Sequence, residues 1–266
     1  MDLALVIEPE QLQPRLGDEH LLLVDLCSES SYRAGHLPGA VHVTPRELIC
    51  GIPPAAGKLP AEGQLEALFS RLGLTPDTHV VVYDDEGGGW AGRMIWTLDV
   101  IGHTRYSYLN GGILAWRAAG LPLDTRPRAA PARQVSLHID TAPVADIDYI
   151  MANLQDPAFA IWDARGGDEY RGEKVLALKG GHIPGAVHCE WTELMDHQRQ
   201  LRIRADAKAY LAARGLTGDK RIVTHCQTHH RSGLTYLVGK TLGFDIRAYD
   251  GSWAEWGNHP DTPVET

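Results

Sequence analysis

The chain has 266 residues, of which 44% are apolar and 22% are charged, and its formal net charge is −9. This ordinary globular composition excludes a disordered, collagen-like or disulfide-scaffold protein, and at roughly 150 residues per domain the length favours two domains. An acidic chain without a basic block is also a poor candidate for binding nucleic acid or anionic membranes, so we expect neither as a partner.

Short apolar runs alternate with helical patterns in the first half of the chain. Leu21–Val24 and Val80–Tyr83 are typical of buried strands, whereas Gln64–Leu72 places its large apolar residues on one helix face. This alternation predicts an α/β domain whose mainly parallel sheet is flanked by helices. Ligands of such sheets bind beyond the carboxyl ends of the strands.

The second half repeats the first. Residues 35–42 read GHLPGAVH and residues 181–188 read GHIPGAVH, so seven of the eight positions are identical. Because the period is a whole domain, the repeat indicates a tandem duplication, with its main insertion around Gly172–Gly180. His36 and His182 occur in both copies, and we therefore expect them to fix a turn rather than to take part in chemistry.

The remaining elements of the second copy follow in the same order. Buried strands are predicted at Ala158–Trp162 and Ile222–His225, and a helical pattern runs from Leu234 to Leu242. The proline-rich stretch from Asp124 to Val144 suits an extended linker between the copies. We therefore divide the chain into an N-terminal domain (1–124), a linker (125–143) and a C-terminal domain (144–266).

The segment CQTHHR, residues 226–231, stands between a predicted strand and a helix that should begin near Ser232. A cysteine in such a turn lies within reach of the backbone amides at the start of the helix, which favour an anion. The thiol pKa of about 8.5 can fall to about 3.5–7.5 in that setting, so Cys226 is predicted to be a thiolate nucleophile. Arg231 adds a fixed positive charge suited to an oxyanion.

Three other chemistries fit this loop less well. Cysteine phosphatases use Cys-x5-Arg, one residue longer than the spacing here, and the smaller loop suits a sulfur atom on Cys226 better than a phosphate. The ligand types His225, Cys226, His229 and His230 are crowded into six residues, which rarely gives a tetrahedron, so we expect no metal. A Cys-His hydrolase would need His229 or His230 as its base, and the sequence shows no carboxylate to orient either ring.

The whole chain resembles a tandem-domain rhodanese, a family of sulfurtransferases. The segment from Tyr32 to Val43 (YRAGHLPGAVHV) is similar to the motif of the family's first half, and Ala248–Trp256 (AYDGSWAEW) is similar to its C-terminal motif. The CQTHHR loop resembles that of bacterial two-domain thiosulfate sulfurtransferases. These motifs occur in the family's order along nearly the full length, and one of them is duplicated.

The resemblance implies a thiosulfate:cyanide sulfurtransferase that needs no cofactor. Cys226 would take the outer sulfur of thiosulfate as a persulfide and pass it to cyanide or a thiol acceptor. The family likeness implies that Arg231 and Arg165 bind the anionic donor and that the loop holds the persulfide through Gln227, Thr228, His229, His230 and Ser232. Two alternatives remain open: a persulfide carrier or sensor that serves a protein donor or acceptor, and a 3-mercaptopyruvate sulfurtransferase.

The loop departs from better-known members of the family. The subgroup that acts on thiosulfate carries two adjacent cations after the cysteine, whereas here His229 and His230 stand in the middle and add charge only when protonated. A second family arginine would fall at about Glu169. We hypothesise that a cation of the nearby insertion compensates, and the candidates are Arg171, Lys174 and Lys179.

The first copy carries no cysteine in the corresponding loop. Aligning the two copies places Asp85 near the position of Cys226, and the neighbouring Asp84 and Glu86 would repel anionic donors. We therefore expect a non-catalytic first domain that covers the second domain's site and forms one wall of its cleft. The spacing of Gly87, Gly89 and Gly92 fits a dinucleotide fingerprint, but the carboxylates argue against a bound pyrophosphate.

The four cysteines are Cys27, Cys50, Cys189 and Cys226, and no pair has CxxC spacing. Free thiols of this number suit a reducing compartment. The segment MDLALVIEPE at the N-terminus does not resemble a secretory signal, and no apolar run approaches the ~20 residues of a membrane span. We therefore expect a cytoplasmic protein.

Overall fold

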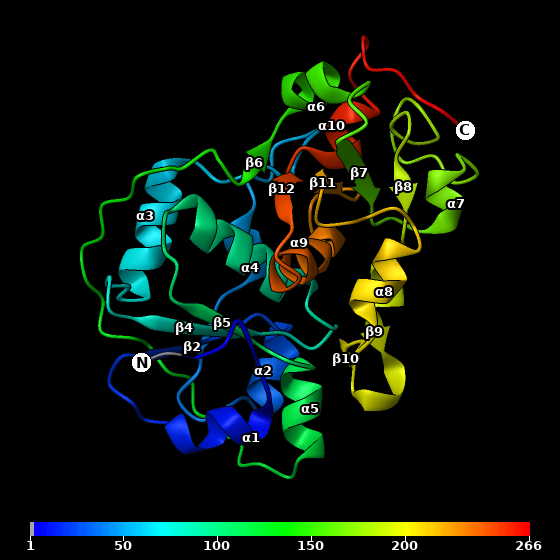
Figure 1. Ribbon diagram of the computed structural model, residues 1–266. Helices are drawn as coiled ribbons and strands as arrows, with labels where there is room; N and C mark the ends of the chain where they lie inside the picture. The colour runs from blue at the N-terminus through cyan, green and yellow to red at the C-terminus, as the bar shows by residue number, and fades with distance from the viewer. Residues whose placement is uncertain (1–2) are drawn as a thin grey trace.

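The computed structural model describes residues 3–266, which form two similar α/β units (Figure 1). The elements of the first half are β1 (Val6–Ile7), α1 (Pro9–Leu12), η1 (Gln13–Arg15), β2 (Leu21–Asp25), α2 (Glu29–Ala34), β3 (Val41–His42), η2 (Pro45–Leu48), α3 (Glu62–Arg71), β4 (His79–Tyr83), α4 (Gly89–Val100), β5 (Tyr106–Leu109) and α5 (Gly112–Ala118). Those of the second half are β6 (Val144–Ala145), α6 (Ile147–Asn153), β7 (Phe159–Asp163), α7 (Gly167–Tyr170), β8 (Val187–His188), η3 (Trp191–Leu194), β9 (Met195–Asp196), η4 (His197–Arg199), β10 (Arg202–Ile203), α8 (Ala207–Ala212), β11 (Arg221–His225), α9 (Arg231–Thr241), β12 (Asp245–Tyr249) and α10 (Ser252–Trp256).

The two halves have the same sheet topology. The strand order is β1-β5-β4-β2-β3 in the first five-stranded sheet and β6-β12-β11-β7-β8 in the second. Every pairing within these two sheets is parallel. The predicted fold class, two tandem α/β units with mainly parallel sheets, is thereby confirmed, and the ends of the four predicted strands agree with β2, β4, β7 and β11 to within one residue.

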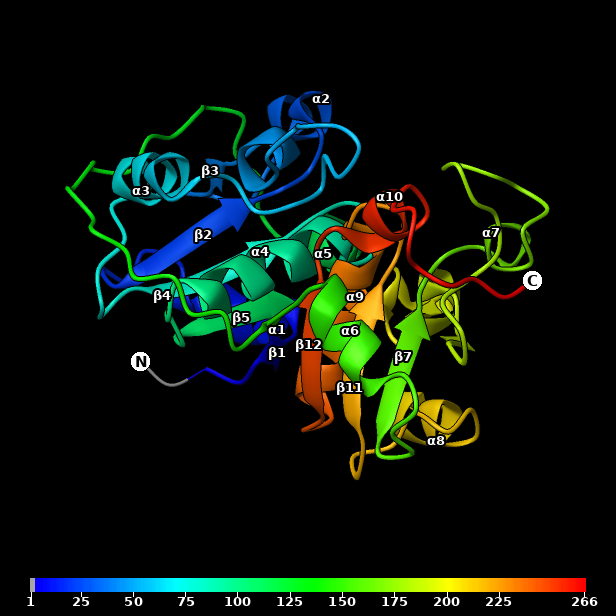
Figure 2. The same cartoon turned by 90° about the horizontal axis from the view of Figure 1, so that it is seen from above.

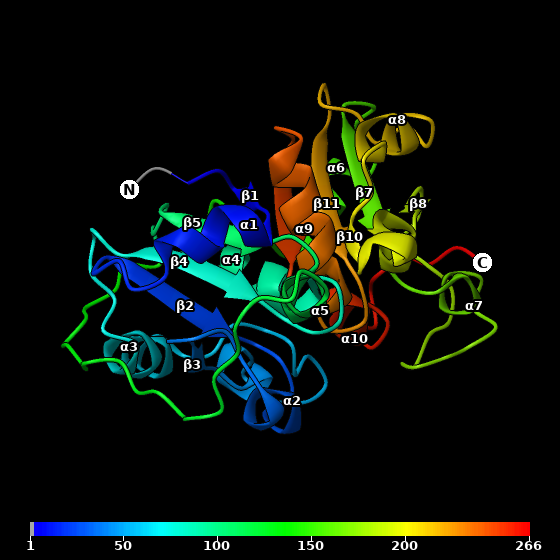
Figure 3. The ribbon, with the colours of Figure 1, turned by 90° about the horizontal axis from the view of Figure 1, so that it is seen from below.

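Helices cover both faces of each sheet, and the inner faces share one core. In the first half α1 and α5 pack on one face and α3 and α4 on the other (Figures 1 and 3). In the second half α6 and α10 cover the outer face, while α8 and α9 cover the inner face. The apolar residues of α4 and α9 belong to a single buried cluster that runs through both halves, so the two units fold against each other.

Two glycines allow α4 and α9 to cross with their backbones in contact (Figures 1 and 2). A Cβ atom added to Gly92 would lie 2.1 Å from the carbonyl oxygen of Gly233, and one added to Gly233 would lie 2.2 Å from the carbonyl oxygen of Gly89. Neither neighbour can move aside, because both are backbone atoms of helices. The glycine pattern of the first loop is thus explained by helix packing and not by a nucleotide.

We expect Gly92→Ala to lower the free energy of unfolding by about 1–3 kcal/mol, because it overpacks this crossing. The matched control is Gly63→Ala in α3, where an added Cβ would meet no atom within 4 Å. That control should raise stability by about 0.5–1 kcal/mol, since alanine has the higher helix propensity. Urea denaturation of both variants measures the difference, and equal stabilities would show that the crossing tolerates a methyl group.

His36 and His182 have the same structural role in the two copies. Their Nδ1 atoms lie 2.8 Å from the carbonyl oxygen of Tyr32 and 2.9 Å from that of Tyr170. Each imidazole also stacks on the ring of that tyrosine, with the centroids 3.8 Å and 3.7 Å apart. Both histidines therefore hold the chain where it turns before the edge strands β3 and β8.

The segment between the sheets has no helix or strand from residue 126 to 140, and it packs along α3. The amides of Arg133 and Val135 bond to the carbonyl and the hydroxyl oxygen of Ser70, each at 2.9 Å.

In the second copy the strands β9 and β10 form an antiparallel ribbon that the sequence patterns did not predict. No helix in residues 3–266 is long and apolar enough to span a membrane.

Candidate active site

Cys226 directly follows β11, and α9 begins five residues later at Arg231, one residue before the predicted start. The cysteine is 1% exposed. Its amide donates to the hydroxyl of Ser252 at 3.3 Å, and its carbonyl accepts from the amide of Trp253 at 3.0 Å. The start of α10 therefore braces the loop through the backbone, which leaves the sulfur free of this anchoring.

The environment of Cys226 favours its thiolate. Burial alone would raise the pKa of this thiol, but three nearby groups outweigh burial and bring the pKa below its ordinary value. These groups are the positive charge of Arg231, the hydroxyl and amide of Ser232, and His230. Burial instead raises the pKa of Cys189 to about 12 and that of Cys27 still further, so both of these thiols stay protonated.

This contrast predicts the pH dependence of alkylation. The rate of reaction of Cys226 with iodoacetamide should rise with pH and reach its half-maximum below about 8.5, because a thiol with a lowered pKa stays ionised at lower pH. Mass spectrometry of the labelled peptides measures the rate at each cysteine. Cys189 should remain unlabelled at neutral pH, and a midpoint above 8.5 for Cys226 would contradict the predicted thiolate.

Arg231 lies beside Cys226 but already has an internal partner. Its two terminal nitrogens lie 2.5 and 2.8 Å from the two carboxylate oxygens of Glu169, which is 3% exposed on α7. Burial would raise the pKa of Glu169, yet its hydrogen bonds with Arg231 and the positive charge of that residue lower it, so the carboxylate is ionised. The positive charge of Arg231, which we expected from the sequence to bind the anionic donor, is thus neutralised by Glu169 within the protein. The 62 residues between the partners gave no sign of this pair in the sequence.

Arg165 is 1% exposed, and its Nε and one of its two terminal nitrogens are bonded within the protein. It forms an ion pair with Asp163 at 2.6 Å, donates to the carbonyl oxygen of Gly181 at 2.7 Å, and covers the ring of Trp253 at 4.2 Å. The structure therefore gives this arginine a role in joining β7 to the GHIPGAVH segment and to α10.

Two of the three cations of the insertion have partners of their own within it or near it. Lys179 donates to the carbonyl oxygens of His259, Pro260 and Thr262, and Arg171 pairs with the exposed Glu173. Lys174 is exposed. The insertion does reach the catalytic loop, because the side-chain amide of Gln227 lies 3.3 Å from the carbonyl oxygen of Leu176.

The two loop histidines have different surroundings. His229 is fully buried, with its Nδ1 atom 2.7 Å from the hydroxyl of Ser232 and its ring edge-on to Trp96. Burial and the nearby charges of Arg93 and His230 hold the pKa of His229 well below 6.5, so it is neutral. His230 bonds to the carboxylate of Glu86 from the first half, a partner that the sequence reasoning did not find.

The corresponding loop of the first copy has a carboxylate in place of the cysteine. Tyr83 pairs with Asp25 in the first sheet as His225 pairs with Asp163 in the second, so the counterpart of Cys226 is Asp84. The predicted alignment with Asp85 is wrong by one residue. The Asp84 carboxylate accepts bonds of 2.8–3.2 Å from four backbone amides: Glu86, Gly87, Gly88 and Ala91.

This amide cradle indicates that the shared loop geometry binds an anion. Asp84 is fully buried, and burial together with Glu86 raises its pKa to about 6, although bonds from the backbone amides oppose the rise. The amides at the corresponding places of the second loop belong to Thr228, His229 and His230, whereas the fourth, that of Gly233, donates to the carbonyl oxygen of His230 at 2.9 Å. A negatively charged sulfur on Cys226 would therefore meet a similar set of donors.

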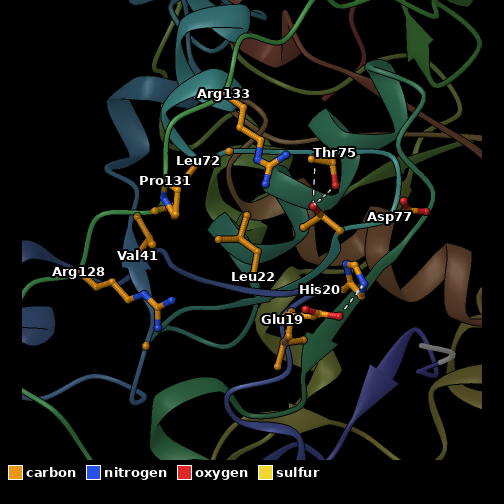
Figure 4. Close-up of a pocket in the computed structure, with 15 residues that line it drawn as sticks. Glu19, His20, Leu22, Val41, Leu72, Thr75, Asp77, Arg128, Pro131 and Arg133 are labelled. Carbon is orange, nitrogen blue, oxygen red and sulfur yellow. Dashed lines mark hydrogen bonds and ion pairs between the residues drawn. The ribbon is translucent and has the colours of Figure 1, made fainter.

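A separate cavity of about 490 Å³ lies between the linker and the amino-terminal ends of β2 and β4 (Figure 4). Arg128 and Arg133 extend over its apolar floor, which includes Leu22, and His20 lies on the other side. It contains no cysteine and lies away from the carboxyl ends of the strands, where Cys226 is placed. Within residues 3–266, no three His, Cys, Asp or Glu side chains are grouped to hold a metal ion.

Comparisons with known proteins show the family to which the chain belongs. The rhodanese-like domain family matches the chain twice, at residues 8–119 and 146–259. A thiosulfate sulfurtransferase from Azotobacter vinelandii is 58% identical over 264 residues, which cover 99% of this chain and 97% of that protein. A thiosulfate sulfurtransferase from Pseudomonas aeruginosa is 56% identical over 265 residues, with 99% and 98% covered.

More distant proteins share the same architecture. A sulfur carrier protein from Thermus thermophilus is 30% identical over 274 residues, which cover 97% of this chain and 95% of that protein. Among solved structures, an anaerobic ergothioneine biosynthesis enzyme from Chlorobium limicola has a TM-score of 0.85 at 22% identity, covering 98% of this chain and 70% of that one. The latter likeness concerns the fold alone.

Proposed function

The chain belongs to the rhodanese-like family and is a sulfurtransferase, and from this premise we propose that it moves sulfur from thiosulfate to cyanide or a thiol through a persulfide on Cys226. The observation that carries the site assignment is the position of Cys226. It stands in a strand-to-helix turn and has a lowered pKa, and the same turn of the first copy holds a carboxylate. We further propose that residues 1–124 form a non-catalytic domain, 125–143 a linker and 144–266 the catalytic domain.

The reaction takes place in two displacement steps. The Cys226 thiolate attacks the outer sulfur of thiosulfate, a new S–S bond forms, and the original S–S bond breaks as sulfite leaves with the electron pair. Cyanide then attacks the terminal sulfur of the persulfide, and thiocyanate leaves while the thiolate is restored. This is ping-pong covalent catalysis, because the first product leaves before the second substrate reacts.

The loop residues divide this work between them. The amides from Gln227 to Ser232 and the hydroxyl of Ser232 stabilise the negative sulfur, as oriented N–H groups do for other anions. The carbonyl oxygen of Thr228 fits against Gly57, where an added Cβ would lie 2.0 Å away, so the first domain forms one wall of the site. His229 is neutral and supports Ser232 rather than supplying charge.

Donor binding is the step in which Arg231 acts. Thiosulfate carries two negative charges, so it competes with the Glu169 carboxylate for the same guanidinium. A 3-mercaptopyruvate donor has one carboxylate and is the weaker competitor on charge alone. We therefore propose thiosulfate as the donor, with Glu169 limiting how tightly any anion binds.

A protein donor or acceptor is a further proposed partner. The insertion beside Gln227 carries Val175, Leu176 and Leu178, which are 53%, 48% and 83% exposed. Apolar side chains exposed together near a reactive group are typical of protein contact sites. We also propose a cytoplasmic location, because the four cysteines are free thiols.

Steady-state kinetics with thiosulfate and cyanide test the proposed reaction. Thiocyanate formation should give parallel lines in double-reciprocal plots, as a ping-pong mechanism requires. Thiosulfate, 3-mercaptopyruvate and a cysteine desulfurase should be compared as donors through the gain in mass of Cys226. An adduct without steady-state turnover would indicate a carrier or sensor in place of an enzyme.

A further inference from the structure

The loop that lacks a cysteine in the first domain lies directly against the catalytic loop of the second. A carboxylate oxygen of Glu86 is hydrogen-bonded to Nε2 of His230, across 144 residues of sequence. A Cβ atom added to Gly89 would lie 2.8 Å from the same nitrogen. The ring of His230 therefore fills the space beside the first residue of α4, where any larger residue than glycine would collide with it.

The His230 imidazole contacts one aromatic ring from each domain. Trp90 of the first domain stacks on it, with the centroids 4.3 Å apart and the planes inclined by 19°. Trp191 of the second domain lies 5.5 Å away at 59°. The amide of Trp90 also lies 3.3 Å from Glu86, so the carboxylate and the stacking ring form one unit of the first domain.

His230 lies within electrostatic range of the Cys226 thiol. His230 is one of the groups that bring the pKa of Cys226 below its ordinary value, so the place at which Glu86 holds this ring affects the thiolate. The other titratable groups of its own loop are Cys226, the neutral His229 and Arg231, which is paired with Glu169. Two acidic residues of the second domain are close to Trp191 in the sequence. Glu193 on η3 is bound to Tyr210 and Arg214, and Glu190 directly precedes η3.

We propose that Glu86 is a positioning residue through which the non-catalytic domain holds the His230 ring beside Cys226 and so completes the active site. This inference rests on the proposed persulfide chemistry of Cys226. It assigns the first domain a chemical contribution in addition to its role as a wall. The Arg231 charge is neutralised by Glu169, so the thiolate depends more on the other groups that lower its pKa, which are Ser232 and His230.

The sign of one measurement separates this role from simple electrostatics. Removing a negative charge near a thiol ordinarily lowers its pKa, because the thiolate is then repelled less. Glu86→Gln should do the opposite and raise the midpoint of Cys226 alkylation by about half a pH unit, since the neutral amide holds the His230 ring less firmly at the place where it favours the thiolate. At a pH below that midpoint, kcat/KM should fall by about threefold, which is the same shift expressed as a rate.

Asp85→Asn provides the matched control. It removes one carboxylate from the adjacent position of the same loop, and Asp85 makes no contact with His230 in the described part of the chain. Its midpoint should stay constant or fall. In the His230→Asn background, Glu86→Gln should have no further effect on the midpoint, as a double-mutant cycle requires for an indirect action.

The outcomes distinguish this inference from the proposed function. A midpoint that falls in Glu86→Gln, or that rises equally in the His230→Asn background, would overturn the role of Glu86. Both results leave the Cys226 persulfide of the unaltered protein measurable by mass. If the unaltered protein forms no persulfide, then the proposed function itself fails. Urea denaturation of each variant separates a loss of fold from a shift in the thiol.

Discussion

Serine in place of Cys226 is expected to lower thiosulfate:cyanide sulfurtransferase activity by at least about a thousandfold, to the background of the uncatalysed reaction. A serine hydroxyl stays protonated at neutral pH and forms no persulfide. The fold should be kept, because the loop is tied through the amide and carbonyl of residue 226 to Ser252 and Trp253. The variant should therefore unfold at nearly the same urea concentration as the unaltered protein.

Cys50→Ser is the control for this prediction. Cys50 is a half-buried free thiol of the first domain, and its replacement should change thiocyanate production by less than about twofold. Colorimetric measurement of thiocyanate compares the two variants directly. Comparable activity in Cys226→Ser and the unaltered protein would show that another group receives the sulfur.

The second large effect is expected at Glu169, whose replacement by glutamine should strengthen donor binding. The neutral amide keeps one acceptor for Arg231 but releases its charge for the thiosulfate dianion. We expect KM for thiosulfate to fall by about three- to tenfold at low ionic strength, with kcat changed by less than about twofold. Stability should fall by about 1–3 kcal/mol, less than for a fully buried pair, because the Arg231 side chain is 20% exposed.

Glu173→Gln is the matched control for Glu169→Gln. It removes the same charge from an exposed carboxylate of the nearby insertion, which pairs with Arg171 rather than with Arg231. KM in this variant should stay within about twofold, since exposed charges are screened by solvent. A rise of KM in Glu169→Gln would mean that the carboxylate positions Arg231 for the donor and does not compete with it.

Sequence patterns predicted the main elements of the fold, because each strand or helix is formed by consecutive residues and leaves its own apolar pattern in the sequence. The apolar runs gave β2, β4, β7 and β11 to within one residue, and the repeated GHxPGA motif marked equivalent turns before β3 and β8. The β9–β10 ribbon was missed because strands of two residues carry no period. The alignment of Asp85 with Cys226 was wrong by one residue, because sequence similarity does not determine which residue directly follows each strand. The pairing of the strands determines it, and it aligns Asp84 with Cys226.

The place of Cys226 between a strand and a helix could also be predicted, but its electrostatic surroundings could not. Strand-to-helix placement singles out Cys226 in one short stretch of sequence. The groups that set its environment come from distant segments: Glu169 reaches Arg231 across 62 residues, and Glu86 reaches His230 across 144. Arg165 shows the same limit, because a turn residue beside the site is directed into an internal ion pair with Asp163.

The structure also changes the meaning of the three carboxylates in the first loop. The sequence suggested that Asp84, Asp85 and Glu86 would repel anionic donors. Two of them are occupied, since Asp84 fills the amide cradle of its own loop and Glu86 bonds to His230. The first domain thus retains the anion-binding turn of its copy, with a carboxylate where the second domain has the reactive sulfur.

The most direct test of the account is the mass of the protein after thiosulfate is added without an acceptor. The persulfide adds one sulfur atom, about 32 Da, and peptide mapping should place this gain on the peptide that contains Cys226. Cyanide should remove the added mass and release thiocyanate in an equal amount. A gain that maps to Cys27, Cys50 or Cys189, or the absence of any gain while turnover proceeds, would contradict a persulfide on Cys226.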